Sequence, residues 1–172
     1  MFKLAGILLL LFGCTGLGIN KVAEEKQRIR DLGEIHRIIV RIQDEMVYGK
    51  RTLPEIGLIL GKCAEEPYRR AFLTIAEKWQ EGKETDLAYL WRDELEICMQ
   101  KLPLTEEEKE ILLHVPTRLG LMDEKQQAAG IGQSLDIIKA HSKKAEAEYG
   151  DKARVIMSIS VMAGLFIGIL LL

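Results

Sequence analysis

The sequence has few cysteines and few aromatic residues, which are common in disulfide-bonded and in nucleic-acid-binding proteins, respectively. Aromatic side chains make up 6% of its 172 residues, and only three cysteines are present. An odd, widely spaced set of cysteines argues against a disulfide framework and favours a reducing compartment. The net charge is −2 at pH 7, and no basic stripe is interleaved with aromatic residues. Nucleic-acid binding is therefore not expected.

Motifs for catalysis, metals and cofactors are also missing. None of His36, His114 and His141 stands three or four residues from a second histidine or a cysteine, a spacing that is typical of zinc sites. No Gly-Lys-Ser/Thr phosphate loop is present. Cys63 and Cys98 could pair if their helices abut, but buried free thiols are the simpler expectation. We therefore predict that the protein is not an enzyme and that it holds no metal or cofactor.

What the chain does contain is an uncharged, mostly apolar run at each end. These runs cover residues 4–19 and 155–172, which are 16 and 18 residues, against about 20 for a typical transmembrane helix. We predict an N-terminal membrane anchor over residues 1–20, a helical domain over 21–154 and a transmembrane helix over 155–172. Lysines and arginines flank the central domain at both ends, so the positive-inside rule places that domain in the cytoplasm.

The first apolar run permits a second interpretation. Residues 11–14, Leu-Phe-Gly-Cys, resemble a lipoprotein box, although the bulky Phe12 stands where such a box usually has a small residue. An uncleaved anchor is the simpler prediction. The alternative is an outward-facing lipoprotein or receptor-like binding module that is anchored through Cys14.

Small residues recur at a four-residue spacing in the second apolar run. Ser160, Gly164 and Gly168 share one helix face, where small side chains allow another helix to approach closely. Two uses of this face stay open: self-association, or packing of the protein's own two membrane helices. Glycine is also simply common in membrane helices.

Between the two runs the apolar pattern follows the helical period of 3.6 residues, with no clean alternation of period two. It predicts an all-α, antiparallel bundle of about six helices between the terminal transmembrane helices, with the last helix running on into the second apolar run. Thr52, Pro54 and Glu55 form a capping-box pattern, as do Thr105 and Glu108. Asp86 and Asp123 are expected helix caps, Pro116 a helix end or bend, Gly120 a turn, and Trp79 and Trp91 core residues.

The ordered set of these features resembles the stage III sporulation protein AB family of endospore-forming bacteria. The resemblance covers essentially the whole length, from the short first span to the terminal one. Its internal motifs are IRDLGEIHRIIVRIQDEMVYGKRTLPEI, Leu90-Trp91 and LGLMDEKQQ. The family-motif positions are Glu45, Tyr48, Pro54, Trp91, Gly120, Asp123 and Gln127. The chain departs from the family in the order Leu53-Pro54, where proline usually precedes leucine.

The resemblance implies a structural component of the channel complex that links mother cell and forespore. It implies a two-pass protein of the mother cell's outer forespore membrane, similar to the platform protein of type II secretion systems. By that similarity the cytoplasmic domain would meet the family's AA-type, secretion-like ATPase, and self-association is a further option.

Two narrower expectations concern the surface of the domain. Glu45 and Tyr48 are expected to fix the first turn between helices, with the Tyr48 hydroxyl bonded to a neighbouring carboxylate or backbone group. Exposed charges are the expected partner contacts, and the two candidate groups are Arg69 and Arg70, and Glu106, Glu107 and Glu108.

Overall fold

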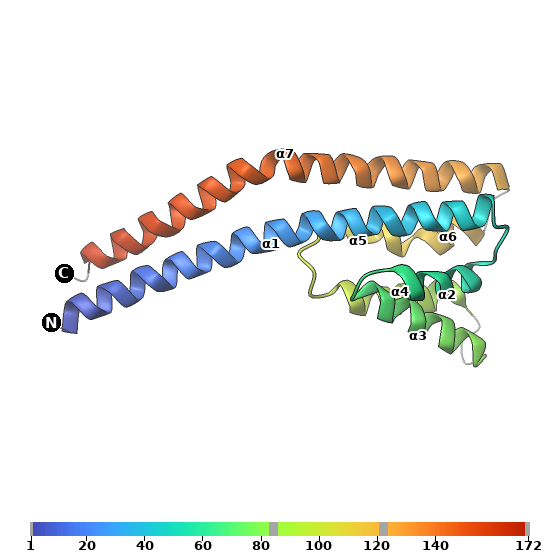
Figure 1. The fold of residues 1–172 in the computed structure, drawn as a ribbon, viewed down its shortest axis with the longest axis horizontal. Helices are drawn as coiled ribbons and strands as arrows, with labels where there is room; N and C mark the ends of the chain where they lie inside the picture. Colours follow the sequence, from blue (N-terminus) through green and yellow to red (C-terminus); the bar gives the residue numbers. More distant parts are fainter. Residues whose placement is uncertain (1, 83–85, 121–123, 171–172) are drawn as a thin grey trace. The chain divides into compact units, whose positions relative to one another are not determined.

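The computed structural model describes residues 2–82, 86–120 and 124–170, and every regular element in these ranges is an α-helix (Figure 1). The helices are α1 (Phe2–Val47), α2 (Leu53–Cys63), α3 (Tyr68–Gln80), α4 (Leu87–Met99), α5 (Glu106–Leu113), α6 (Val115–Gly120) and α7 (Glu124–Leu170). The predicted all-α helical bundle is confirmed, with seven helices in the described residues where about six were expected.

The chain forms two compact units. The hairpin unit contains Met1–Ile29 and Lys143–Leu172, and the helical unit contains Arg30–Ser142. Helix α1 begins in the first unit and ends in the second, and α7 passes between the same units in the other direction. Both helices are continuous across the unit boundary, as the sequence predicted for the last helix.

Three helix starts in the helical unit follow directly from local sequence. The Glu55 carboxylate accepts hydrogen bonds from the backbone N–H and the hydroxyl of Thr52, at 2.8 and 2.9 Å. At α5, Glu108 accepts from the Thr105 N–H at 2.9 Å, and the Thr105 hydroxyl accepts from the Glu108 N–H at 3.3 Å. Asp86 caps α4 by accepting from the Ala88 N–H at 2.9 Å. The two capping boxes and the Asp86 cap were all predicted, and each satisfies backbone donors that a helix start leaves free.

The core of the helical unit joins the apolar face of α1 to the short helices. Ile35, Ile39 and Ile42 on α1 are fully buried, as expected from their helical spacing. Phe72 from α3 and Trp91 from α4 are also buried, and their ring centroids lie 5.2 Å apart at an interplanar angle of 57°. Such tilted pairs are favourable for aromatic rings.

Two features of α4 to α6 differ from the sequence expectation. Helix α5 ends at Leu113, before Pro116 as predicted, but a further short helix, α6, begins at Val115. Proline is tolerated there because the first turn of a helix does not need its N–H. Helix α4 ends at Met99, which is fully buried, whereas Cys98 is only half-buried.

Candidate functional site

The turn between α1 and α2 is organised by Glu45. Its carboxylate lies 3.2 Å from Nε of Arg41 and 3.1 Å from Nε of Arg51, and its backbone carbonyl accepts from the Arg51 N–H at 3.1 Å. A Cβ atom at Gly49 would lie 2.6 Å from the same carbonyl oxygen. Residue 49 therefore has to be glycine for the chain to leave α1 in this direction.

Tyr48 does not make the hydrogen bond that was expected of it. Its side chain is 84% exposed, and among the described residues its hydroxyl has no hydrogen-bond partner. The reason is its position, because α1 ends at Val47 and residue 48 already belongs to the turn. Tyr48 therefore presents its ring to solvent, while Glu45 and Gly49 shape the turn.

Trp91 has both a packing role and a polar one. Its indole Nε1 donates to the backbone carbonyl of Leu112 at 3.0 Å. Leu112 lies in the last turn of α5, and its carbonyl is also approached by the backbone N–H of the cap residue His114. Trp91 thus ties α4 to the end of α5 and satisfies a buried acceptor. Trp79 is only half-buried, so the core prediction holds more fully for Trp91.

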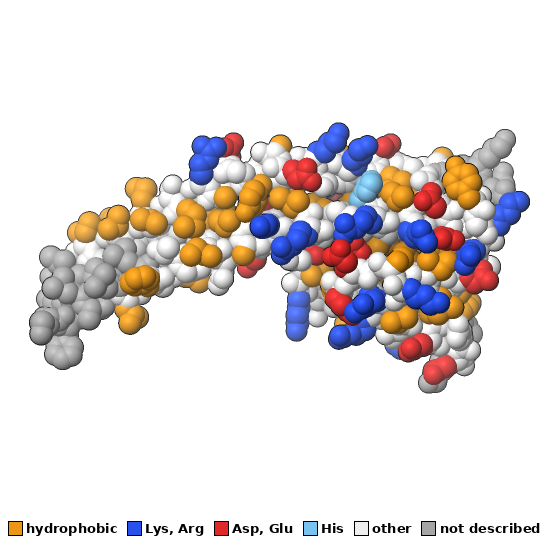
Figure 2. Space-filling model, in the orientation of Figure 1, with side chains coloured by type: hydrophobic (Ala, Val, Ile, Leu, Met, Phe, Trp, Pro, Cys, Tyr) orange, Lys and Arg blue, Asp and Glu red, His pale blue; other side chains and the backbone are white. Residues whose placement is uncertain are grey.

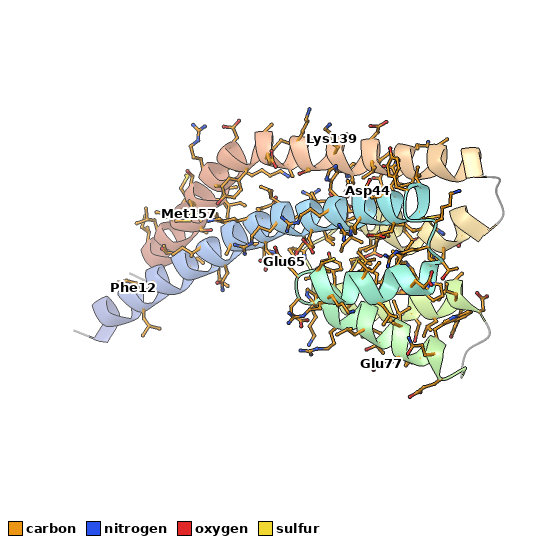
Figure 3. All side chains as sticks on the ribbon, turned by 45° about the vertical axis from the view of Figure 1, so that its right-hand side comes forward. Phe12, Asp44, Glu65, Glu77, Lys139 and Met157 are labelled. Carbon is orange, nitrogen blue, oxygen red and sulfur yellow. The ribbon has the colours of Figure 1, made fainter. Side chains whose placement is uncertain are left out.

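A buried carboxylate that the sequence did not reveal ties α1 to the α2–α3 loop. Glu34 is 5% exposed. One carboxylate oxygen accepts from the Glu65 backbone N–H at 2.8 Å, and the other accepts from Nε of Arg37 at 2.7 Å. The Arg37 guanidinium also reaches the Glu65 carboxylate at 2.9 Å. Glu65 is labelled at this loop in Figure 3.

Two ionisable side chains of the helical unit, Tyr68 of α3 and Cys98 of α4, are held in their neutral forms. Tyr68 is buried, and burial together with the negative charge of Asp31 raises the pKa of its hydroxyl. Burial, with smaller contributions from Glu66 and Asp31, raises the pKa of the Cys98 thiol to about 12. A thiol with such a pKa is not a nucleophile at neutral pH. Cys63 is exposed, so the expectation of two buried thiols is wrong for this residue.

The expected acidic face on α5 contains one residue fewer than predicted. Glu108 is completely buried, because its carboxylate caps α5 and also lies 3.2 Å from Nδ1 of His141 on α7. Glu107 remains exposed, and Glu106 pairs with Lys109 at 2.8 Å. In the other expected contact group, Arg69 pairs with Glu66 at 2.8 Å, whereas Arg70 is exposed.

Three family-motif positions lie around the α6–α7 connection. Gly120 is the last residue of α6. Asp123, the expected cap of the last helix, lies outside the described residues. Gln127 lies near the start of α7, and its side chain is not among those described.

Two ion pairs join neighbouring helices of the helical unit. The guanidinium of Arg92 on α4 reaches the Glu110 carboxylate on α5 at 2.7 and 3.3 Å. Lys78 on α3 pairs with Glu94 on α4. Within the described residues, no three histidine, cysteine or acidic side chains are grouped to hold a metal ion. A shallow hollow beside His36, Val40 and Asp44 on α1 shows no nucleophile paired with a base.

The hairpin unit packs the first part of α1 against the last part of α7. A Cβ atom on Gly18 of α1 would lie 2.6 Å from Oγ of Ser160 on α7. Gly164 and Gly168 are buried in the same unit, one and two turns further along α7. Lys152 of α7 lies 3.7 Å from the Glu25 carboxylate of α1. The two segments therefore run antiparallel and approach closely at Gly18.

Most other apolar side chains described in this unit face outward. Phe12 is 77% exposed and Met162 is 70% exposed, and Figure 2 shows hydrophobic side chains along the exposed face of the unit. Among the described residues, one helical stretch is long and apolar enough to cross a membrane. It lies within Ala129–Ile169, and its most apolar window has a mean hydropathy of 1.6.

These features define the class of protein: an all-α protein with a bundle of short helices and one long helix that is apolar enough to cross a membrane. The family model of stage III sporulation protein AB matches residues 3–172. The chain therefore belongs to the stage III sporulation protein AB family, and this membership supports a role in sporulation.

A curated relative and a solved structure agree with this assignment. The stage III sporulation protein AB of Bacillus subtilis (strain 168) is 23% identical over 172 residues, which is 100% of both chains. A solved structure of a stage III sporulation protein AB matches with a TM-score of 0.63 and 21% identity. That match covers 72% of this chain and 96% of the other. At this identity the solved structure supports the fold.

Proposed function

We propose that this protein is a non-enzymatic, membrane-anchored structural component of the channel complex between mother cell and forespore. The observation that carries the proposal is the family match over residues 3–172. The interior of the helical unit supports a structural role, because the buried carboxylates of Glu34 and Glu108 are engaged in ties between segments. The anchor is placed in the mother cell's outer forespore membrane.

The proposed topology has two membrane passes with the helical unit in the cytoplasm. Helix α1 contains the first apolar run and α7 the second, and each continues without a break into the helical unit. The described part of α7 has the hydropathy of a membrane span. Lys21, Lys26, Lys152 and Arg154 lie just inside the two runs, where the positive-inside rule favours the cytoplasmic side.

The proposed partner of the helical unit is the family's AA-type, secretion-like ATPase, whose motion the unit would pass to membrane components. The surface offers suitable contacts, because Tyr48 and Tyr89 are 84% and 64% exposed. Exposed tyrosines are frequent anchors in protein interfaces. A rigid unit can transmit the motion of a partner to the membrane helices. The ion pairs of Arg92 with Glu110 and of Lys78 with Glu94 hold α3, α4 and α5 together.

The topology is tested by adding trypsin to intact sporulating protoplasts and then to lysed ones. We expect the helical unit to be protected until lysis. Cleavage in intact protoplasts would place the unit outside, remove the ATPase from its reach and favour the lipoprotein alternative. Metabolic lipid labelling that is lost in Cys14→Ser would then identify the anchor.

The partner is tested by co-purification of the ATPase with the full-length protein in mild detergent. Combined Tyr48→Ala and Tyr89→Ala substitutions should lower recovery of the ATPase by about tenfold if both rings are interface anchors. Gln80→Ala, at another exposed position, is the control and should leave recovery unchanged. Equal recovery in all three proteins would exclude these two tyrosines as interface anchors, and circular dichroism would verify that the fold is intact.

A further inference from the structure

The antiparallel register of the hairpin unit is fixed at two points. Gly18 lies opposite Ser160, and Glu25 pairs with Lys152. The residue numbers of these two pairs add up to 178 and 177. Each residue of α1 therefore lies beside the α7 residue whose number brings the total to 177 or 178. Met157, which precedes Ser160 by three residues on the same face of α7, also approaches this position, because its sulfur would lie 3.4 Å from a Cβ on Gly18. Figure 3 labels Met157 on α7.

This register places the inner ends of the two apolar runs at nearly the same level. The run on α1 ends at Ile19, which lies opposite residue 158 or 159 of α7. The run on α7 begins at Val155, three to four residues away. At 1.5 Å per residue the offset is about 4.5 to 6 Å, the length of one helical turn. Both helices therefore change from apolar to charged in one narrow layer.

The charges in that layer are paired locally. Lys21 lies 2.6 Å from Glu24, and Arg154 lies 2.6 Å from Asp151. In each pair both side chains are mostly exposed. Such pairs reach into water rather than into the hairpin, which is the behaviour of charged side chains at the edge of a bilayer.

The run on α1 is bounded by charge at both of its ends, by Lys3 and Lys21. The run itself contains 16 residues, 4–19, and the polar Asn20 separates it from Lys21; all of these residues are helical. The helical length of the run is therefore about 24 Å, against about 30 Å for the hydrocarbon core of an ordinary bilayer. The lysine side chains can extend outward and reduce this deficit by a few ångströms. Tilting the helix would only shorten its reach.

We propose that the two runs insert as one hairpin that fits a hydrocarbon layer of about 24 Å, and that its preferred partner is a thin, short-chain bilayer. This inference rests on the membrane anchoring proposed above and adds the thickness of the layer. Because Gly18 and Ser160 hold the two helices together, the run on α1 sets the fit for the pair. A thicker bilayer has to thin locally around the hairpin or leave it partly uninserted.

The test uses the full-length protein reconstituted into phosphatidylcholine vesicles that differ only in acyl-chain length. Myristoleoyl, palmitoleoyl, oleoyl, eicosenoyl and erucoyl lipids provide the series. The measurement is the fraction of protein that floats with the vesicles after an alkaline carbonate wash. We expect the highest retention in the two shortest lipids and at least about threefold less in erucoyl vesicles.

A lengthened variant provides the matched comparison. Four leucines are inserted after Leu10 of α1 and four after Ile167 of α7, which adds about one turn to each helix. Both insertions lie beyond the Gly18–Ser160 and Glu25–Lys152 contacts, so the register is retained. The retention maximum of this variant should move to oleoyl or eicosenoyl lipids. Circular dichroism verifies that both proteins are helical.

The possible results separate this inference from the anchoring on which it rests. Equal retention of the natural chain in all lipids, or an unmoved maximum in the lengthened variant, would overturn the thickness match while leaving the anchor in place. No flotation in any lipid would overturn the anchor itself, and the thickness match with it.

Discussion

The contact between Trp91 and the end of α5 gives the sharpest test of the helical unit. The substitution is Trp91→Phe, which keeps a ring in the core but removes the indole N–H. That N–H donates to the Leu112 carbonyl at 3.0 Å, and Trp91 is fully buried. The matched control is Trp79→Phe, because Trp79 is half-buried and its indole has no hydrogen-bond partner among the described residues.

The expected loss follows from two contributions. Removing the donor leaves a buried carbonyl without its side-chain partner, which costs about 1 kcal/mol. Replacing the indole with the smaller phenyl ring removes buried apolar surface and leaves a small void, which costs about another 1 kcal/mol. The free energy of unfolding should therefore fall by about 2 kcal/mol. For a unit of this size that corresponds to a decrease of about 8 °C in Tm.

The measurement is thermal unfolding of the full-length protein in mild detergent, followed by circular dichroism. Trp79→Phe should lower the Tm by no more than about 3 °C, because a half-buried side chain contributes less apolar burial. If Trp91→Phe and Trp79→Phe have the same Tm, the hydrogen bond to Leu112 contributes nothing measurable. Trp91 would then not stabilise the end of α5 through this hydrogen bond.

Three further predictions concern other contacts. Gly18→Ala should destabilise the hairpin by about 1–3 kcal/mol in a denaturing-detergent titration, whereas Gly16→Ala should not, because a Cβ there meets nothing within 4 Å. Glu34→Ala should lower the free energy of unfolding by about 1–3 kcal/mol, and Glu34→Gln by less, because an amide oxygen can still accept from the Glu65 N–H. Cys98 should react with maleimide more slowly than the exposed Cys63 at neutral pH, since its raised pKa leaves little thiolate. Its rate should rise about tenfold per pH unit until the pH approaches that pKa of about 12, and equal rates in the folded protein would contradict this.

Sequence reasoning was most successful where the determinants lie close together in the chain. The capping boxes at Thr52 and Thr105 and the cap at Asp86 each depend on residues within three positions of one another. The apolar face of α1 follows in the same way from the helical period. Trp91 was identified as a core residue because it stands on the apolar stripe of its helix.

The features that sequence reasoning missed are all contacts between distant segments. Glu108 was read as exposed because the acidic start of a helix usually is, yet the approach of His141 from 33 positions away encloses it. Glu34 was not singled out because its partner is a backbone N–H in a loop 31 positions later. Tyr48 was expected to make a hydrogen bond because a tyrosine near a helix end often does, but Gly49 and Lys50 set the direction in which the chain leaves α1 and Tyr48 stays exposed. Lys50 has a φ of 47°, a left-handed conformation that lysine rarely adopts and that sequence does not reveal.

Several ionisable side chains of the helical unit are buried in its interior and not available on its surface. Glu34 and Glu108 are buried and engaged in ties between segments, and Cys98 and Tyr68 are kept protonated at neutral pH by burial. A catalytic site needs groups whose pKa lies near the working pH and that can reach a substrate. Burial raises the pKa of the Cys98 thiol and of the Tyr68 hydroxyl away from neutral pH, and the carboxylates of Glu34 and Glu108 are enclosed by the fold. The exposed tyrosines of the helical unit and the lipid-facing side of the hairpin unit are therefore the surfaces to which the proposed partner and bilayer contacts are assigned.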